Sequence, residues 1–178
     1  MGQETVETVR TEQIEVPTGE AMRELGRRLA AVLRGGDLLV LSGGLGAGKT
    51  TFTQGLGVGL GVRGAVTSPT FVIARVHPSL ADGPALVHVD AYRLGGADVA
   101  AEVDDLDLDA SLDESVTVVE WGEGKVEDLS EERLQILIAR AEGQDVAEGD
   151  DVRVVTLQGI GERWAGVDFG AALAEDNV

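Results

Sequence analysis

The residues with the clearest chemical meaning form one short segment, Gly43 to Thr50, which reads GGLGAGKT and matches the pattern G-x-x-x-x-G-K-[ST] in full. Glycines in such a loop let the backbone approach phosphate oxygens and turn its N–H groups toward them. Lys49 can reach the β- and γ-phosphates of a nucleotide, and the Thr50 hydroxyl can ligate Mg²⁺. The segment predicts a phosphate-binding loop, with expected contacts from Gly43, Leu45, Gly46, Ala47, Gly48, Lys49, Thr50 and Thr51.

A glycine-rich turn can match this pattern by accident, and the chain contains 25 glycines. Lysines are rare, however: only Lys49 and Lys125 occur, and one of them falls at the required position. A guanine-binding Asn/Thr-Lys-x-Asp element is absent, because the only asparagine is Asn177 and Lys125 follows a glycine. ATP is therefore the expected nucleotide, and a small-molecule kinase that uses the same loop remains open.

Two acidic residues stand where a P-loop ATPase needs one, at the end of a buried strand, to hold the metal or its waters. Asp90 follows the run LVHV, and Glu120 follows the run VTVV. The spacing does not say which of the two contacts Mg²⁺. The segment TSPT at 67–70 offers hydroxyls that could sense a γ-phosphate, and it is equally compatible with ordinary turn chemistry.

Strands and helices must position these residues. Thr18 is expected to cap a helix that runs to about Arg34, and a second helix is expected from the phosphate loop through Leu60. Each glycine in the second helix costs on the order of 1 kcal/mol relative to alanine, so its order should depend on packing and bound ligand. Strands are expected at 5–16, 37–42, 71–76, 86–92, 115–121, 134–139 and 152–156, with a weak helix at 97–103.

This alternation of helices and apolar strands predicts an α/β fold. We expect a single P-loop NTPase-like domain with a mostly parallel central sheet and some antiparallel strands, the last two strands pairing as a hairpin. Trp164 and Phe169 are interpreted as packing anchors of the C-terminal segment.

Composition excludes several functions. The formal net charge is −18, which disfavours unaided binding to DNA, RNA or anionic lipid. The chain has no cysteine, so a thiolate metal site or a cysteine nucleophile is excluded. No apolar run approaches the roughly 20 residues that span a bilayer. A soluble, cytoplasmic protein is expected.

Four strings in order, GGLGAGKTTF, TSPTF, HVDAYRL and VEWGE, resemble the bacterial TsaE family over about Thr18 to Arg140. Members of this family are ATPases required for threonylcarbamoyladenosine formation on tRNA. The resemblance implies that the loop binds ATP and that Thr50 and Glu120 hold Mg²⁺. It places Trp121 near the nucleotide. The family usually carries an acidic residue where this chain has Gly44.

The same resemblance implies roles for the remaining motif residues. Asp90 would be a catalytic acid or a water-positioning residue, supported by His88, Tyr92 and Arg93, and the segment 67–70 would form a switch in which Thr70 serves catalysis. Hydrolysis would be slow in the isolated protein. The implied partners are TsaB and TsaD, which would carry the tRNA, so this chain would meet tRNA only indirectly.

The expected organisation is a lead-in strand at 1–16, the P-loop ATPase domain at 17–160 and a partly frayed C-terminal extension at 161–178. Two alternatives stay open beside the ATPase. One is the small-molecule kinase, against which the lack of an arginine-rich lid segment counts. The other is a nucleotide-gated binding module with little turnover.

Overall fold

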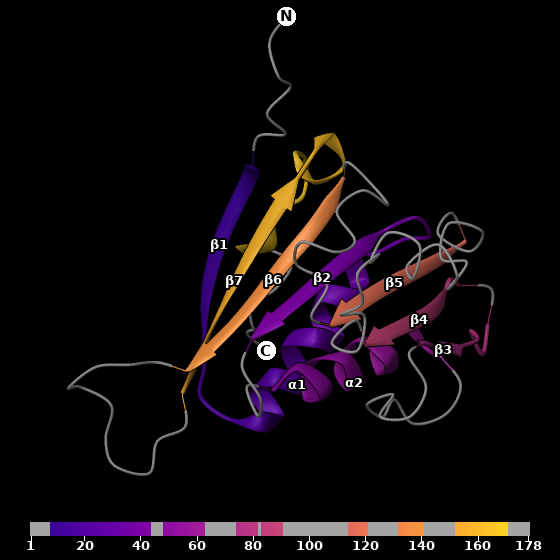
Figure 1. The fold of residues 1–178 in the computed structure, drawn as a ribbon, viewed down its shortest axis with the longest axis horizontal. Helices are drawn as coiled ribbons and strands as arrows, with labels where there is room; N and C mark the ends of the chain where they lie inside the picture. The colour runs from indigo at the N-terminus through magenta and orange to yellow at the C-terminus, as the bar shows by residue number, and fades with distance from the viewer. Residues whose placement is uncertain are drawn as a thin grey trace, which may run out of the picture.

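The computed structural model describes residues 8–43, 48–62, 74–81, 83–90, 114–120, 132–140 and 152–170, which form one seven-stranded sheet and two α-helices (Figure 1). The strands are β1 (Thr8–Val16), β2 (Leu38–Gly43), β3 (Ala74–His77), β4 (Ala85–Asp90), β5 (Ser115–Glu120), β6 (Arg133–Arg140) and β7 (Arg153–Ile160). The helices are α1 (Gly19–Leu29) and α2 (Lys49–Leu60), with 3-10 turns at Ala30–Val32 and Glu162–Trp164. The expected helix at 97–103 and the switch at 67–70 lie outside the described residues.

The strand order is β1-β7-β6-β2-β5-β4-β3. The four central strands, β6, β2, β5 and β4, run parallel to one another. Antiparallel strands flank them, β7 and then β1 on one side and β3 on the other. The predicted α/β fold with a parallel core and antiparallel additions is confirmed, as is the hairpin of the two late strands.

Helix α1 begins as the sequence predicts. The Thr18 hydroxyl accepts a hydrogen bond from the backbone N–H of Ala21 at 3.1 Å, which satisfies one of the free N–H groups of the first turn. The helix ends at Leu29, however, and tightens into a 3-10 turn instead of continuing to about Arg34. The Arg34 N–H donates to the side chain of Asp37 at 2.8 Å, so it is not available to extend the helix.

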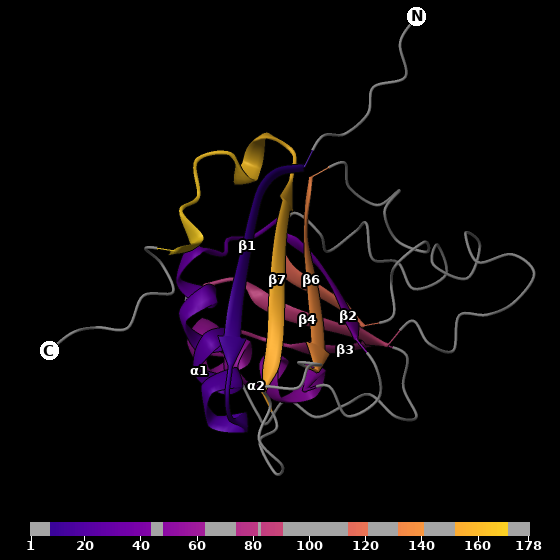
Figure 2. The same cartoon turned by 90° about the vertical axis from the view of Figure 1, so that its left-hand side faces the viewer.

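Helices α1 and α2 lie side by side on one face of the sheet (Figure 2). Their backbones approach so closely that side chains are excluded at the crossing. A Cβ atom on Gly55 would lie 1.9 Å from the carbonyl oxygen of Arg23, and one on Gly26 would lie 2.2 Å from that of Phe52. The glycines that weaken α2 as an isolated helix are thus what allow it to pack on α1.

The core between helices and sheet is aliphatic. Alternate residues of the strands point toward the helices, as the two-residue period of a strand requires. They include Leu39, Leu41, Val116, Val118, Ile136 and Leu157, which join one buried cluster with Phe52 and Leu56 of α2. Strand β5 is buried on both faces along its whole length, as expected for a central parallel strand. Among the described residues, no helix is long and apolar enough to cross a membrane.

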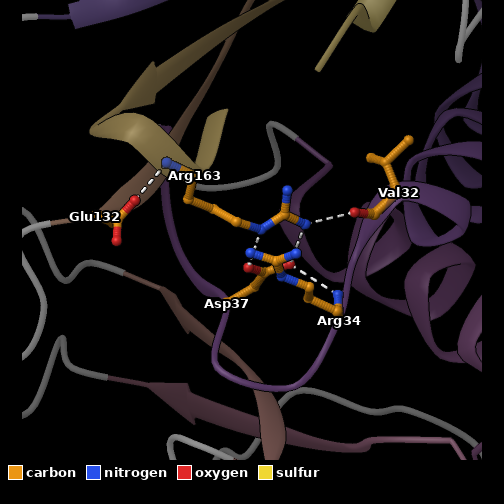
Figure 3. Close-up of polar contacts among 5 residues, drawn as sticks. All are labelled: Val32, Arg34, Asp37, Glu132 and Arg163. Atoms are coloured by element: carbon orange, nitrogen blue, oxygen red, sulfur yellow. Dashed lines mark hydrogen bonds and ion pairs between the residues drawn. The ribbon is translucent and has the colours of Figure 1, made fainter. Parts of the chain in front are cut away.

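The C-terminal segment clamps the amino end of the parallel strands (Figure 3). Arg163 donates from Nε to Oδ1 of Asp37 at 2.8 Å and from Nη2 to Oδ2 at 3.0 Å. Nη2 also donates to the carbonyl oxygen of Val32 at 2.7 Å. The backbone N–H of Arg163 donates to the carboxylate of Glu132. Asp37 lies immediately before β2, so the clamp fixes the start of the strand that leads to the phosphate loop.

Trp164 and Phe169 anchor the same segment. Both side chains are fully buried, and their rings stack with centroids 6.0 Å apart. Gly159 of β7 lies directly against Trp164, since a Cβ atom there would be 2.5 Å from the Cβ of Trp164. Packing therefore holds residues 161–170 against the antiparallel side of the sheet.

Candidate nucleotide-binding site

The candidate site lies at the carboxyl edge of the parallel strands. In open α/β sheets ligands bind outside this edge, where the loops following the strands converge. The strand register aligns the predicted residues there: Asp90 of β4 pairs with Glu120 of β5, and Glu120 lies opposite Leu41 of β2. Strand β2 continues two residues further, to Gly43, where the glycine-rich segment predicted to bind phosphate begins. Residues from three separate motifs therefore reach one edge of the sheet.

The two ends of the loop are tied together by Lys49. Its Nζ donates a hydrogen bond to the carbonyl oxygen of Gly43 at 2.7 Å, and the side chain is buried. Gly48 caps α2 with a φ of 112°, a left-handed conformation that glycine adopts without steric cost. The Thr53 hydroxyl donates to the Lys49 carbonyl at 2.9 Å within the helix. Lys49 thus stands in the first turn of α2, where the helix dipole and free N–H groups favour an anion.

A buried carboxylate ends the neighbouring strand β5. Glu120 has 3% of its surface exposed, and its Oε2 lies 3.1 Å from Nε2 of His88, which is fully buried. A carboxylate can only accept hydrogen bonds, so Nε2 of His88 is the donor when Glu120 is ionised. Among the described residues this contact engages only Oε2 of Glu120.

The donor set fits a nucleotide-bound Mg²⁺. This ion prefers oxygen ligands and is usually held by one or two protein groups together with phosphate oxygens and waters, not by a cage of side chains. A buried carboxylate, Glu120, and a hydroxyl on the first turn of α2, Thr50, supply such oxygens. The part of the chain that the structure describes holds no cluster of three or more His, Cys, Asp or Glu residues able to bind a metal by itself.

The predicted site residues differ in how far the structure describes them. Lys49, Thr50, Thr51, Gly43, Gly48 and Glu120 are described, and for Asp90 the backbone position is given. Leu45, Gly46, Ala47, Thr70 and Trp121 lie outside the described residues, as do Tyr92 and Arg93.

His88 makes a contact that the sequence analysis did not predict. Its ring contacts Glu120 on the neighbouring strand. The strand register explains this contact. His88 pairs with Val118, two residues before Glu120, so the side chains of His88 and Glu120 lie on the same face of the sheet.

A comparison with known protein families identifies the family of this chain. The model of the family described as threonylcarbamoyl adenosine biosynthesis protein TsaE matches residues 16–148. The chain belongs to the TsaE family. The match confirms the resemblance drawn from the four sequence strings, and its range includes residues 43–50 and Glu120.

Relatives within the TsaE family come from several bacteria. The tRNA threonylcarbamoyladenosine biosynthesis protein TsaE of Streptomyces coelicolor is 72% identical over 148 residues, covering 83% of this chain and 96% of that protein. The protein of the same name from Bacillus subtilis is 41% identical over 147 residues, covering 82% and 84%. The crystal structure of Bacillus subtilis YdiB matches the fold with a TM-score of 0.69 at 33% identity, covering 94% of this chain and 96% of that one.

Proposed function

We propose that this protein binds and hydrolyses Mg²⁺-ATP as a component of threonylcarbamoyladenosine modification of tRNA. The observation that carries the proposal is the position of Lys49. This lysine holds the base of a glycine-rich loop at 2.7 Å from Gly43, at the sheet edge where Glu120 ends the neighbouring strand. The names of the relatives support the pathway, because they are called tRNA threonylcarbamoyladenosine biosynthesis proteins.

In this proposal the chain acts mainly by positioning and electrostatics, as is general for phosphoryl transfer. Lys49 and the N–H groups of the loop and the first turn of α2 stabilise negative charge on the β- and γ-phosphates. Thr50 and Glu120 hold Mg²⁺, which neutralises charge on the phosphate oxygens when bound. By the family resemblance, Asp90 and Thr70 would orient the attacking water, and Trp121 would contact the nucleotide.

The partners in the proposal are TsaB and TsaD. The net charge of −18 opposes direct binding to tRNA, so the tRNA is carried by the partner pair. Nucleotide hydrolysis by this chain then resets the pair, and turnover is slow until the pair is present.

Phosphate release from Mg²⁺-ATP tests the proposal, measured with and without the TsaB–TsaD pair. Lys49→Ala should abolish release, because the charge that faces the β- and γ-phosphates is lost. Lys125→Ala is the matched control, since it removes the only other lysine and should leave release unchanged. Release that survives Lys49→Ala would contradict the proposed site. Phosphate transferred to an added metabolite would identify a kinase instead, and full tRNA modification by Glu120→Gln would identify a nucleotide-gated binding module.

A further inference from the structure

His88 is a polar side chain in an aliphatic setting. It is fully buried on β4, next to Leu86 along its face of the strand and opposite Val118 of β5. Its Nε2 contacts Oε2 of Glu120 at 3.1 Å. Its second ring nitrogen, Nδ1, is also buried and has no hydrogen-bond partner among the described residues.

Stability alone does not account for a histidine at this position. A buried polar atom without a partner costs about 1–3 kcal/mol, and an aliphatic residue would fill the same row without that cost. The contact that the ring does make is to the carboxylate proposed as a metal ligand. Side chains in this relation to a ligand orient it and raise its basicity, and their loss weakens metal affinity about 10- to 100-fold.

We infer that His88 is a positioning residue, which fixes the Glu120 carboxylate through Oε2 so that Oε1 is presented to the nucleotide-bound Mg²⁺. The inference rests on the proposed Mg²⁺-ATP site. It assigns to His88 no contact with the nucleotide itself. Removal of the ring therefore affects the metal, whereas nucleotide affinity in the absence of metal is preserved.

The test measures ADP binding by calorimetry in EDTA and across a Mg²⁺ titration. His88→Leu should raise the Mg²⁺ concentration needed for half-maximal effect by about 10- to 100-fold, with unchanged affinity for metal-free ADP. His88→Gln should recover part of the loss, because its terminal amide can donate from near the position of Nε2. A purely structural role predicts equal losses with and without Mg²⁺, and that result would overturn the inference. If His88→Leu does not fold, His88→Gln compared with wild type decides by the same criterion.

Two controls separate the possible failures. Glu120→Gln should weaken Mg²⁺ dependence at least as strongly as His88→Leu. If Glu120→Gln changes nothing, the proposed metal site itself is wrong. If Glu120→Gln weakens Mg²⁺ and the His88 variants do not, only the role of His88 is refuted. Thr117→Val removes another buried polar group of β5, on the opposite face of the sheet, and should leave the Mg²⁺ titration unchanged.

Discussion

Two buried polar pairs lie at opposite ends of the parallel part of the sheet. Asp37 pairs with Arg163 at the amino end, and Glu120 pairs with His88 at the carboxyl end. At the amino end, both oxygens of Asp37 are engaged, by Arg163 at 2.8 and 3.0 Å and by the Arg34 N–H at 2.8 Å. At the carboxyl end, one oxygen of Glu120 contacts His88, and Nδ1 of His88 has no partner among the described residues. In the first pair every oxygen of the carboxylate accepts a hydrogen bond, which is typical of a structural network. In the second pair hydrogen-bonding capacity is left over, which is typical of a site that binds a ligand.

The difference teaches how to separate stabilising from functional polar groups in this fold. A fully satisfied buried network stabilises a unique structure, whereas a partly satisfied one is costly and is retained where binding requires it. The amino end of the sheet should therefore govern stability, and the carboxyl end should govern Mg²⁺ and nucleotide binding.

The same chemical change at the two ends gives the largest expected contrast. Asp37→Asn places an amide among three N–H donors and leaves Arg163 without its charge partner. It should cost about 3 kcal/mol, or roughly 6–12 °C in Tm. Glu120→Gln should change stability by less than about 1 kcal/mol, because a neutral amide is cheaper to bury and its oxygen still accepts from His88. Thermal melts of both variants check this contrast, and equal losses would contradict it.

Gly55→Ala should lower both the stability of the fold and the affinity for nucleotide. The added Cβ would lie 1.9 Å from the Arg23 carbonyl oxygen, and backbone cannot move aside as a side chain can. Overpacking of this kind costs about 1–3 kcal/mol, and the displaced α2 carries Lys49 with it, so nucleotide affinity should fall as well. Gly19→Ala is the control, since its Cβ would meet nothing within 4 Å. Denaturant unfolding measures the stability, and ADP titration measures the nucleotide affinity. If only one of the two falls, the packing of α2 on α1 does not control the position of Lys49.

Thr117 tests whether an unpaired polar atom alone marks a functional site. Its Oγ1 is buried without a partner among the described residues. The side chain lies on the other face of the sheet from Glu120. Thr117→Val should raise stability by about 1 kcal/mol, since an unsatisfied hydroxyl is removed at constant volume. Chemical denaturation measures the gain. A loss of ATP binding in this variant would reveal a functional role for the opposite face.

An exposed ion pair should contribute least. Hydrogen bonds from Arg27, and then from Arg28, lower the pKa of Glu24 from 4.5 to about 2. Because the folded-state pKa is depressed, the stabilisation is complete above pH 4.5 and is lost as the pH falls toward 2. The Tm of wild type should therefore be slightly higher than that of Glu24→Gln at pH 6. This difference in Tm should disappear in acid and in 1 M salt. A gap that persists in acid would rule out the charge as its cause.

Local features of the sequence predicted much of this structure. The Thr18 cap and the apolar runs of β2 and β5 depend on neighbouring residues, so periodicity and capping signals identify them. Contacts between distant segments did not follow from the sequence. The Asp37–Arg163 pair joins positions 126 residues apart, and the His88–Glu120 contact depends on strand register. The sequence predicts that the glycines weaken α2. Their role in packing, as at Gly55, becomes visible only when the position of α1 is known.

The order of strands also has a consequence for how the protein is made. In the described sheet β1 pairs only with β7, so β1 finds its neighbour only after Arg153–Ile160 has been synthesised. At about 5–20 residues per second, roughly 140 further residues take some 7–30 s. During that interval β1 has no partner strand, and the charged residues Glu12 and Glu15 along it are of the kind that discourage pairing with other nascent chains.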